Sequence, residues 1–400
     1  MISLSAARVA IVHDWLETPG GSELVLEELL AVFPGADVFT MIDQRSAASR
    51  SSGHALAAAR ITTSWMQHIP AIKRNYRAWL PLMPLALRSL DVSAYDIVIS
   101  NSHAVAKGVR THSRQLHLCY CLSPMRYAWD LKAQYLREAG LDHGVKGSLA
   151  SAMLERMRRW DLANTPGVDA FATLSRYIAE RIERAYGRPA VVIYPPVDTE
   201  YFTPPTPATP ATPAERGEEV NPHEVKREEF YVTASRFVPY TRVDMIARAF
   251  RSLADRKLVV IGDGPDEAKV RAAAGLNVEL VGRLSREEVR SYLRRARAFV
   301  FAAEEDFGIA PVEAQACGTP VIAFGRGGVM ETVRGLDSAT PTGVFYAEQT
   351  AEALAEAVRR FEALTRPISA EACRANALRF GAEIFRERFR SFVEGKYEKA

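Results

Sequence analysis

The sequence lacks a hydrophobic run long enough to cross a membrane. Its 400 residues contain no stretch of about eighteen uncharged apolar residues. The apolar start of the chain carries no basic region ahead of it, so we expect a mature N-terminus and not a signal peptide. We therefore expect a cytoplasmic protein, with peripheral binding to the inner face of the plasma membrane left open.

The sequence is also poor in cysteine and in net charge. Its four cysteines have neither metal-ligand nor disulfide spacing, so buried, reduced thiols are expected. We expect Cys119 and Cys121 to point to opposite faces of one strand. The 51 basic and 48 acidic residues give a formal net charge of +3, which is too small to indicate a nucleic-acid partner.

The remaining composition is that of a globular protein of two-domain size. Hydrophobic residues make up 48% and charged residues 25% of the chain, and 400 residues exceed one ordinary core. A predicted strand at 9–13, a glycine-rich turn, a helix at 22–33 and a strand at 37–41 follow one another. This order is typical of a parallel α/β domain. We predict an α/β fold whose N-terminal Rossmann-like domain spans residues 1–202.

A change of composition marks the predicted domain boundary. Residues 203–229 are rich in Pro, Thr and Ala and then in charged residues, as in a linker or an insertion. A second Rossmann-like domain is predicted over 230–380, where Ser285 followed by Glu288 has the pattern of a capping box. Residues 381–400 form a predicted amphipathic helix that packs back on the N-terminal domain.

The segment from Trp65 to Arg88 mixes tryptophans with basic residues. Such a segment can lie on an anionic bilayer surface. It can equally be a packed helical excursion of the domain, and composition alone favours that second interpretation.

Two glutamates eight residues apart bracket a turn in the second half of the chain. Glu305 and Glu313 flank a glycine-containing turn that opens a predicted helix ending at Ala316. Glu313 then lies on the second helical turn, where its carboxylate can accept ribose hydroxyls, and the free N–H groups near 307–309 attract phosphate. The alternative is that both glutamates merely complement the helix dipole.

This segment, EDFGIAPVEAQACGTPVIAFGRGGVMETV, resembles the donor-site signature of the retaining GT-B glycosyltransferases of family 4. The resemblance extends over nearly the whole chain, through HDWLETPGGSE, SPMRYAWD, VIYPPVDTEYF and SRFVPYTRVD. These segments resemble the branch that includes O-antigen mannosyltransferases using GDP-mannose. The resemblance implies a GT-B fold, in which two Rossmann-like domains face each other across a donor and acceptor cleft.

The resemblance also implies a reaction. It points to a retaining, metal-independent hexosyltransferase of surface-polysaccharide synthesis, with mannose from GDP-mannose as the donor sugar and no separate cofactor. The implied acceptor is a saccharide or a lipid-linked saccharide. No Asp-x-Asp pattern occurs, which in the other main glycosyltransferase fold holds a divalent metal on the diphosphate. Arg236, neighbouring cations and helix amides would then neutralise the leaving diphosphate.

Residue by residue, the resemblance assigns Glu313 to the donor ribose and Glu305 to the transferred hexose or the reacting centre. The backbone of Phe307, Gly308 and Ile309 is implied to receive sugar hydroxyls and the diphosphate.

Arg236 follows the first strand of the second domain. The resemblance pairs it with the diphosphate, because a guanidinium group can bind phosphate through two parallel hydrogen bonds. A plain surface charge is the alternative. The other donor-side positions are Gly262, Asp263 and Gly264 under the nucleotide, and Gly282, Arg283 and Leu284 beside the base.

In the N-terminal domain, His103 ends a predicted strand, and the resemblance places it beside the transferred sugar and the β-phosphate as a catalytic residue. A structural histidine is the alternative. Gly20 and Gly21 resemble the turn that lets backbone amides approach the diphosphate, although two glycines can also form an ordinary tight turn. The acceptor-side positions are Ser123, Pro124, Arg126 and Tyr127.

The sequence departs from the family pattern at two positions. Relatives carry histidine at Leu122, and at Thr241 they carry a lysine that contacts the diphosphate. If Thr241 occupies that place, the site lacks a cation, and Thr241→Lys is expected to raise turnover at least about tenfold. The alternative is that Arg242 fills the gap.

Two further classes compete with the glycosyltransferase interpretation. A catalytically weak or inactive GT-B protein with a binding or assembly role is the second reading, and Thr241 supports it. A nicotinamide-dependent dehydrogenase ranks last, because VVIGDG lacks both a full Gly-x-Gly-x-x-Gly pattern and an acidic residue at the next strand end. A GT-B epimerase or phosphorylase would share the same nucleotide or phosphate site.

Overall fold

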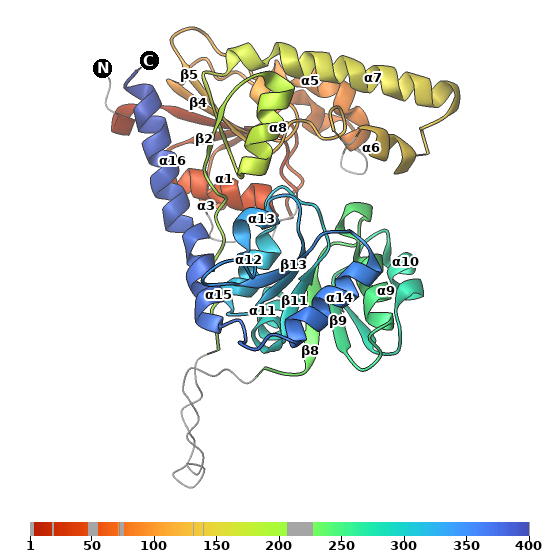
Figure 1. Cartoon of the computed structure of the whole chain (residues 1–400). Helices are drawn as coiled ribbons and strands as arrows, with labels where there is room; N and C mark the ends of the chain where they lie inside the picture. Colours follow the sequence, from red (N-terminus) through yellow and green to blue (C-terminus); the bar gives the residue numbers. More distant parts are fainter. Residues whose placement is uncertain are drawn as a thin grey trace. The chain divides into compact units, whose positions relative to one another are not determined.

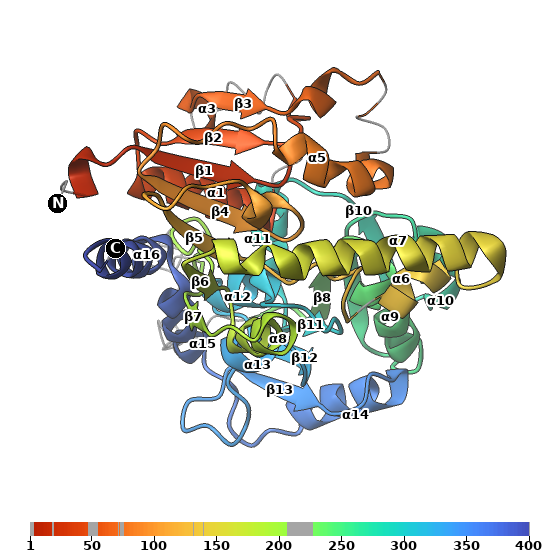
Figure 2. The same cartoon turned by 90° about the horizontal axis from the view of Figure 1, so that it is seen from above.

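The computed structural model describes residues 4–17, 20–46, 55–70, 72, 76–130, 132–138, 140–205 and 227–399. Contacts divide the chain into two units. We call Met1–Pro196 together with Ala382–Ala400 the N-terminal unit, and Val197–Gly381 the C-terminal unit. Each unit is an open parallel sheet with helices on both faces, and the strands and helices are labelled in Figures 1 and 2.

The N-terminal unit holds a seven-stranded sheet in the order β3-β2-β1-β4-β5-β6-β7. Its strands are β1 Val9–His13, β2 Asp37–Thr40, β3 Ile61–Thr63, β4 Ile97–Ser102, β5 Leu116–Cys121, β6 Ala170–Thr173 and β7 Ala190–Val192. Every residue of β1, β4 and β5 is buried. A strand that is buried on both faces consists of a nearly continuous apolar run, and this is the pattern that predicted the strand at 9–13. The structure confirms that strand as β1.

The helices of this unit are α1 Gly21–Val32, α3 Ala55–Ala58, α5 Met83–Leu87, α6 Lys132–Glu138, α7 Gly144–Ala163, α8 Arg176–Tyr186 and α16 Ala382–Tyr397. Its 3-10 turns are η1 Leu4–Ala6, η2 Trp65–His68, η3 Tyr76–Leu82, η4 Ala106–Gly108 and η5 Thr165–Gly167. Helix α16 packs on β5 and α1: the rings of Phe385 and Phe389 lie 5.7 and 6.0 Å from that of Tyr120, and Arg386 donates to Glu28 at 2.6 Å.

The C-terminal unit holds a six-stranded sheet in the order β10-β9-β8-β11-β12-β13. Its strands are β8 Phe230–Ala234, β9 Lys257–Ile261, β10 Val278–Gly282, β11 Ala298–Phe301, β12 Val321–Phe324 and β13 Gly343–Tyr346. Its helices and turns are η7 Pro239–Thr241, α9 Val243–Arg251, α10 Glu267–Ala273, α11 Arg286–Arg295, α12 Ile309–Ala316, α13 Val329–Thr332, α14 Ala351–Glu362, α15 Ala370–Ala377 and η8 Leu378–Phe380.

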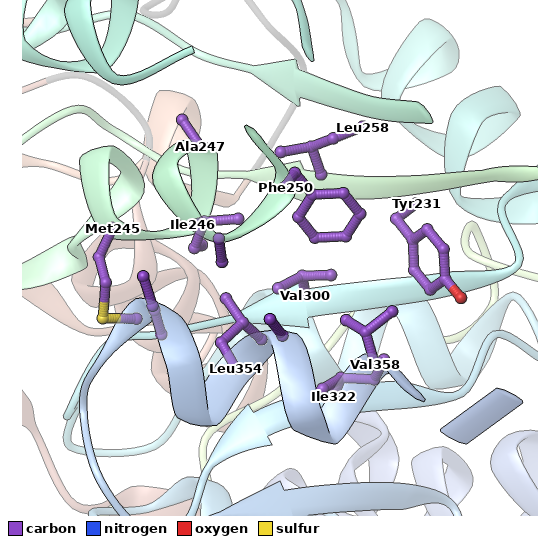
Figure 3. Close-up of a cluster of buried hydrophobic side chains, with 14 of the residues drawn as sticks. Tyr231, Met245, Ile246, Ala247, Phe250, Leu258, Val300, Ile322, Leu354 and Val358 are labelled. Atoms are coloured by element: carbon purple, nitrogen blue, oxygen red, sulfur yellow. The ribbon is translucent and has the colours of Figure 1, made fainter. Parts of the chain in front are cut away.

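The core on one face of this sheet joins α9 and α14 to the strands (Figure 3). Phe250 of α9 packs 5.2 Å from the ring of Tyr231, and Leu354 and Val358 come from α14. These side chains are less than 2% exposed, so each contributes about 1.5–3 kcal/mol of burial free energy. The core therefore holds the carboxyl ends of β8 and β11 in a rigid frame.

The boundary between the two units differs from the expected one. The boundary between the units lies at 196/197, earlier than residue 202, because the segment after Pro196 pairs with the C-terminal unit. There Val197 N donates to Phe380 O at 2.8 Å, and Thr203 O accepts from Arg294 Nε at 2.6 Å. Of the expected linker 203–229, residues 206–226 lie outside the described residues.

The expectation for the paired cysteines was wrong. Cys119 and Cys121 lie on the same face of β5 and share a hydrogen bond, because residues two apart in a strand point the same way. All four cysteines are buried thiols, and burial raises the pKa of Cys317 and of Cys373 to about 12.

Both sheets have a topological switch point, at which the strand order reverses direction. In the N-terminal unit the chain runs from β1 outward to β3 and then returns to β4 on the other side of β1. In the C-terminal unit the corresponding neighbours are β8 and β11. In open parallel sheets, ligands bind outside the carboxyl ends of the two strands at such a point.

Candidate functional site

The switch point of the C-terminal unit lies between the loops that follow β8 and β11. The loop after β11 leads through Glu305 to Gly308, which is the N-cap of α12 with φ of 85°. The side chain of Phe307 is buried and packs 5.4 Å from the ring of Phe380, so only its backbone can face a ligand. Glu313 lies on the second turn of α12, as its spacing predicted.

Glu313 has an unusual electrostatic environment. Burial is the main cause that raises the pKa of its carboxyl group to about 7; Arg286 acts against this shift, and Asp198 adds a smaller upward contribution that is included in that value. Arg286 and Asp198 form an ion pair with an N···O distance of 2.9 Å. A carboxylate that is costly to ionise, placed on a helix beside a strand end, is a candidate for ligand binding.

A glycine turn after β12 holds the Glu305 loop in place. Gly328 N donates to Glu305 O at 2.8 Å. A Cβ at Gly327 would lie 2.5 Å from Glu305 O, and one at Gly328 would lie 2.3 Å from Asp306 O. Because neither position has room for a side chain, the two loops form one close-packed rim at the end of β11 and β12.

The loops after β8 and β9 are joined in a similar way. Phe237 N donates to Asp263 O at 2.7 Å, and a Cβ on Gly262 would lie 1.9 Å from Ser235 O. Arg236 lies between Ser235 and Phe237, whose backbone N–H groups both donate to the end of β9 and the loop after it. The Arg236 side chain is exposed.

The loop after β10 continues this edge of the sheet. Gly282 O accepts a hydrogen bond from Gly262 N at 2.8 Å, and Arg283 and Leu284 lead into α11. The predicted capping box is confirmed, because the Ser285 and Glu288 side chains each accept from the other's backbone N–H.

The turn after Arg236 has an unexpected orientation. The Thr241 hydroxyl lies 2.9 Å from Arg236 O and 2.7 Å from Val238 O, and the residue is 5% exposed. Arg242 follows in the left-handed region, with φ of 55° and ψ of 33°. Thr241 therefore points into its own turn, and Arg242 is partly exposed.

The switch point of the N-terminal unit lies between the ends of β1 and β4, where His13 is paired with Asn101. Asp14 follows His13 and is fully buried. Its carboxylate accepts from the backbone N–H groups of residues 103 to 106 at 2.6 to 2.9 Å. Asp14 thus closes the turn that carries His103.

The imidazole of His103 is held on two sides. Its Nδ1 lies 3.2 Å from Asp14 Oδ2, and its ring meets that of Trp15 edge-on at 4.6 Å. The side chain is 29% exposed. With Nδ1 turned to the buried carboxylate, Nε2 is the ring nitrogen left for a ligand.

The comparisons with known proteins agree with this architecture. Residues 215–380 match the model of a family described as Glycosyl transferases group 1. Across 97% of this chain and 100% of the other, the structure resembles that of the Anabaena protein HepE in complex with UDP, with a TM-score of 0.67 and 15% identity. The chain has the GT-B fold. At this identity the likeness establishes the architecture alone.

Curated relatives of this GT-B chain include mannosyltransferases. A GDP-mannose-dependent monoacylated alpha-(1-6)-phosphatidylinositol monomannoside mannosyltransferase of Corynebacterium glutamicum is 30% identical over 183 residues, 42% of this chain and 47% of the relative. A GDP-mannose-dependent alpha-(1-6)-phosphatidylinositol monomannoside mannosyltransferase of Mycolicibacterium smegmatis is 31% identical over 221 residues, 50% and 54% respectively. The chain spans about half the length of these relatives.

In this GT-B chain the donor-side positions of the C-terminal unit gather at one edge of the sheet. They follow neighbouring strands β10, β9, β8 and β11, so the strand order itself brings them together. Gly20 and Gly21 open α1 in the N-terminal unit. Gly20 is the N-cap in extended conformation, and no side chain caps the helix.

The four acceptor-side positions follow β5, and two of them are buried. Ser123 and Pro124 are buried, and the Ser123 hydroxyl donates to Pro124 O at 2.8 Å. Arg126 and Tyr127 are partly exposed. Of the four, only Arg126 and Tyr127 are partly exposed, and the hydroxyl oxygen of Tyr127 is itself buried.

The segment 65–88 has a buried side and an exposed apolar side. Met66, Ile72, Tyr76, Met83 and Leu87 pack in the core, whereas Trp65, Trp79, Leu82 and Leu85 are exposed. Lys73 and Arg74 lie outside the described residues. No described helix is long and apolar enough to span a bilayer.

Asp14 and Trp15 were not predicted as site residues from the sequence. The signal was present, because Asp14 and Trp15 come directly after an apolar strand that ends at His13, where ligand-facing residues are expected. Within the described ranges, no group of three His, Cys, Asp or Glu side chains is placed to hold a metal ion.

Proposed function

We propose that this protein transfers a hexose from a nucleotide sugar to a saccharide or lipid-linked saccharide acceptor in surface-polysaccharide synthesis. Glu313 is the observation that carries the proposal. Its carboxyl group is raised in pKa to about 7 at a switch point, where ribose hydroxyls could supply the hydrogen bonds that burial has removed. The family model that matches residues 215–380 supports the same assignment.

The proposed donor is GDP-mannose. Two curated relatives are named as GDP-mannose-dependent mannosyltransferases, which favours this donor. The structural neighbour from Anabaena was solved with UDP, so the uridine donor is the competing choice.

The proposed reaction retains the configuration at the transferred carbon and uses no metal ion. Arg236 and the backbone amides that begin α12 would stabilise the negative charge on the departing diphosphate. His103 would contact the transferred sugar through Nε2, and the leaving phosphate would help to deprotonate the acceptor hydroxyl. Analysis of the product by NMR tests retention, and activity in excess EDTA tests the metal requirement.

Nucleotide binding is the first test. GDP, UDP and ADP are compared by thermal shift, because a ligand at a hundred times its Kd stabilises by about 2.7 kcal/mol. Stabilisation by GDP above the other two, followed by release of GDP from GDP-mannose with an acceptor, supports the proposal. If none of the three raises the Tm, the glycosyltransferase assignment is wrong and a binding or assembly role is favoured.

A membrane-bound acceptor is proposed from the exposed apolar residues of the N-terminal unit. Trp79 and Leu85 are exposed in the 65–88 segment, and α7 exposes Val145 and Leu149 beside Lys146. Apolar residues with neighbouring cations bind anionic bilayers in a salt-sensitive manner. Co-sedimentation with phosphatidylglycerol vesicles at low and high salt tests this.

The test variant for that experiment is the double replacement Val145→Ser and Leu149→Ser. The control is Leu276→Ser in the C-terminal unit, because Leu276 is likewise an exposed apolar residue. Weaker sedimentation of the double variant alone supports a membrane surface on α7. Failure of the unaltered protein to sediment at low salt contradicts it.

A further inference from the structure

Arg242 has a backbone conformation that arginine rarely adopts. It is the one non-glycine residue with positive φ in the part of the chain that the structure describes. For residues with a Cβ this region is strained, and strained residues are retained mainly where the surrounding structure or a function requires them. Nothing in α9 itself requires an arginine here, since glycine would adopt the same angles at no cost.

The preceding turn directs Arg242 outward. Thr241 is buried, and its hydroxyl lies within hydrogen-bond distance of the carbonyl oxygens of Arg236 and Val238. This contact ties the start of α9 to the backbone of Arg236. With Thr241 turned inward, the next side chain in the sequence is the one that emerges at the surface.

Arg242 emerges at the switch point. Its Nη1 lies 3.5 Å from Gln349 Oε1, and Gln349 Nε2 donates to Ala302 O at 2.8 Å. Ala302 is the residue that follows β11, whereas Arg242 belongs to the connection after β8. The guanidinium group therefore reaches, through Gln349, from the connection after β8 towards the end of β11.

We propose that Arg242 is a diphosphate-binding residue of the donor site and that its strained backbone is retained to aim the guanidinium group at the switch point. The inference rests on the proposed function. Arg242 would supply, with Arg236, the second positive charge on a nucleoside diphosphate. A guanidinium group suits this task because it can bind phosphate oxygens in a bidentate manner. Thr241 is then a positioning residue that holds both arginines through one turn.

The test uses Arg242→Gly, which removes the charge and the strain together. We expect the Tm to rise by about 2–4 °C, the shift that relief of modest strain gives in a domain of this size. We also expect the Kd for GDP to rise at least about tenfold, which corresponds to ~1.4 kcal/mol. The Kd for GMP should change less than about twofold, since the distal phosphate is absent. Arg242→Lys should fall between the parent and Arg242→Gly in GDP affinity.

Arg248→Ala is the matched control. Arg248 lies on the same helix, and its guanidinium group pairs with Asp244 at 3.6 Å. Its loss should leave both nucleotide affinities unchanged. Titration calorimetry on the full chain supplies the affinities, with UDP and UMP or ADP and AMP in place of the guanine pair if the parent prefers them.

The outcomes separate the two proposals. If the parent binds a nucleoside diphosphate and Arg242→Gly binds it equally well, Arg242 does not contact the diphosphate, and the glycosyltransferase assignment stands. Equal losses for the diphosphate and the monophosphate also overturn the inference, because they indicate a general disturbance of the site. If the parent binds none of these nucleotides, both proposals are wrong.

Discussion

The carboxylate of Asp14 accepts hydrogen bonds from four consecutive backbone amides, beginning with that of His103. Asp14 directly follows β1 and His103 directly follows β4, so this contact ties the two strands of the N-terminal switch point together. The same carboxylate lies 3.2 Å from Nδ1 of the His103 ring. One buried acidic side chain thus sets both the backbone turn and the orientation of the imidazole.

Asp14→Asn should therefore damage stability and turnover together. An asparagine side chain has one acceptor oxygen, so its NH2 group would face backbone donors, at a cost of about 3 kcal/mol or more. Urea unfolding measures the loss, and release of GDP from the donor measures turnover. Asp91→Asn is the control, because Asp91 is exposed and its hydrogen bonds are only to nearby Ser93, so this replacement should change stability much less. Equal effects of the two replacements would mean that the Asp14 contacts contribute little.

His103→Ala should lower turnover much more than affinity for free nucleotide. The ring is partly exposed and is proposed to act on the transferred sugar and on charge that develops in the transition state. A loss of about a hundredfold in kcat with the Kd for GDP changed less than about threefold is the expected pattern. Parent-level kcat would assign His103 a structural role only.

Glu313→Gln should increase the stability of the folded protein and weaken its binding of nucleotide. Unfolded, the carboxyl group ionises near pH 4.5, whereas in the folded protein its pKa is about 7. The unfolded state therefore releases its proton first, and this group lowers the free energy of unfolding as pH rises from about 4.5 to about 7, by roughly 3 kcal/mol in all. Glutamine does not ionise and removes that loss, so the variant should exceed the parent in free energy of unfolding most clearly near pH 8. Urea unfolding at pH 5 and pH 8 measures the difference.

The same variant should lose nucleotide affinity. A charged acceptor on a ribose hydroxyl contributes about 1.5–3 kcal/mol, so the Kd for GDP should rise at least about tenfold near pH 8. The parent should bind more tightly as pH rises through about 7, and Glu313→Gln should show no such dependence. Glu356→Gln, at an exposed position on α14, is the control. Unchanged affinity in Glu313→Gln would leave Glu313 as a helix residue without a ligand.

Acid should destabilise the N-terminal unit through His117. Burial lowers the pKa of its imidazole to about 4, while its nitrogens lie 3.0 Å from Ser100 Oγ and 2.8 Å from Gly167 O. The unfolded state takes up a proton below about pH 6.5 and the folded state only near pH 4, so the free energy of unfolding falls by roughly 3 kcal/mol over that range. Urea titrations from pH 7 to pH 4 should be flatter for His117→Gln, whereas His68→Gln, at an exposed position, should follow the parent.

Thr241→Lys should destabilise the protein and bring no gain in turnover. The resemblance predicted the opposite, but the Thr241 side chain is buried and its hydroxyl is bonded within its own turn. A lysine there must either bury its charge or open the turn, at a cost of about 2 kcal/mol or more. Differential scanning calorimetry and donor turnover give the two quantities. A more active variant of unchanged Tm would restore the interpretation of a site that merely lacks its lysine.

The sequence by itself determined the features that depend on local patterns: strands, helix starts and positions along a helix. The apolar runs predicted parallel strands such as β1, the pair Ser285 and Glu288 predicted the start of α11, and the spacing of Glu305 and Glu313 placed the second glutamate on the second turn of α12. Each depends on neighbours within a few residues, so backbone periodicity and capping are enough to predict it.

Only the tertiary structure decided the environment of the site. Asp14 and His103 are 89 residues apart, and the strand order brings them into contact. The raised pKa of Glu313 is the balance of burial and Asp198, which raise it, against Arg286, which lowers it, and both charged residues lie far from Glu313 in the sequence. The inward turn of Thr241 and the left-handed Arg242 depend on how η7 packs at the end of β8. Burial, charge pairing and backbone strain arise from contacts between distant segments, and no local pattern specifies them.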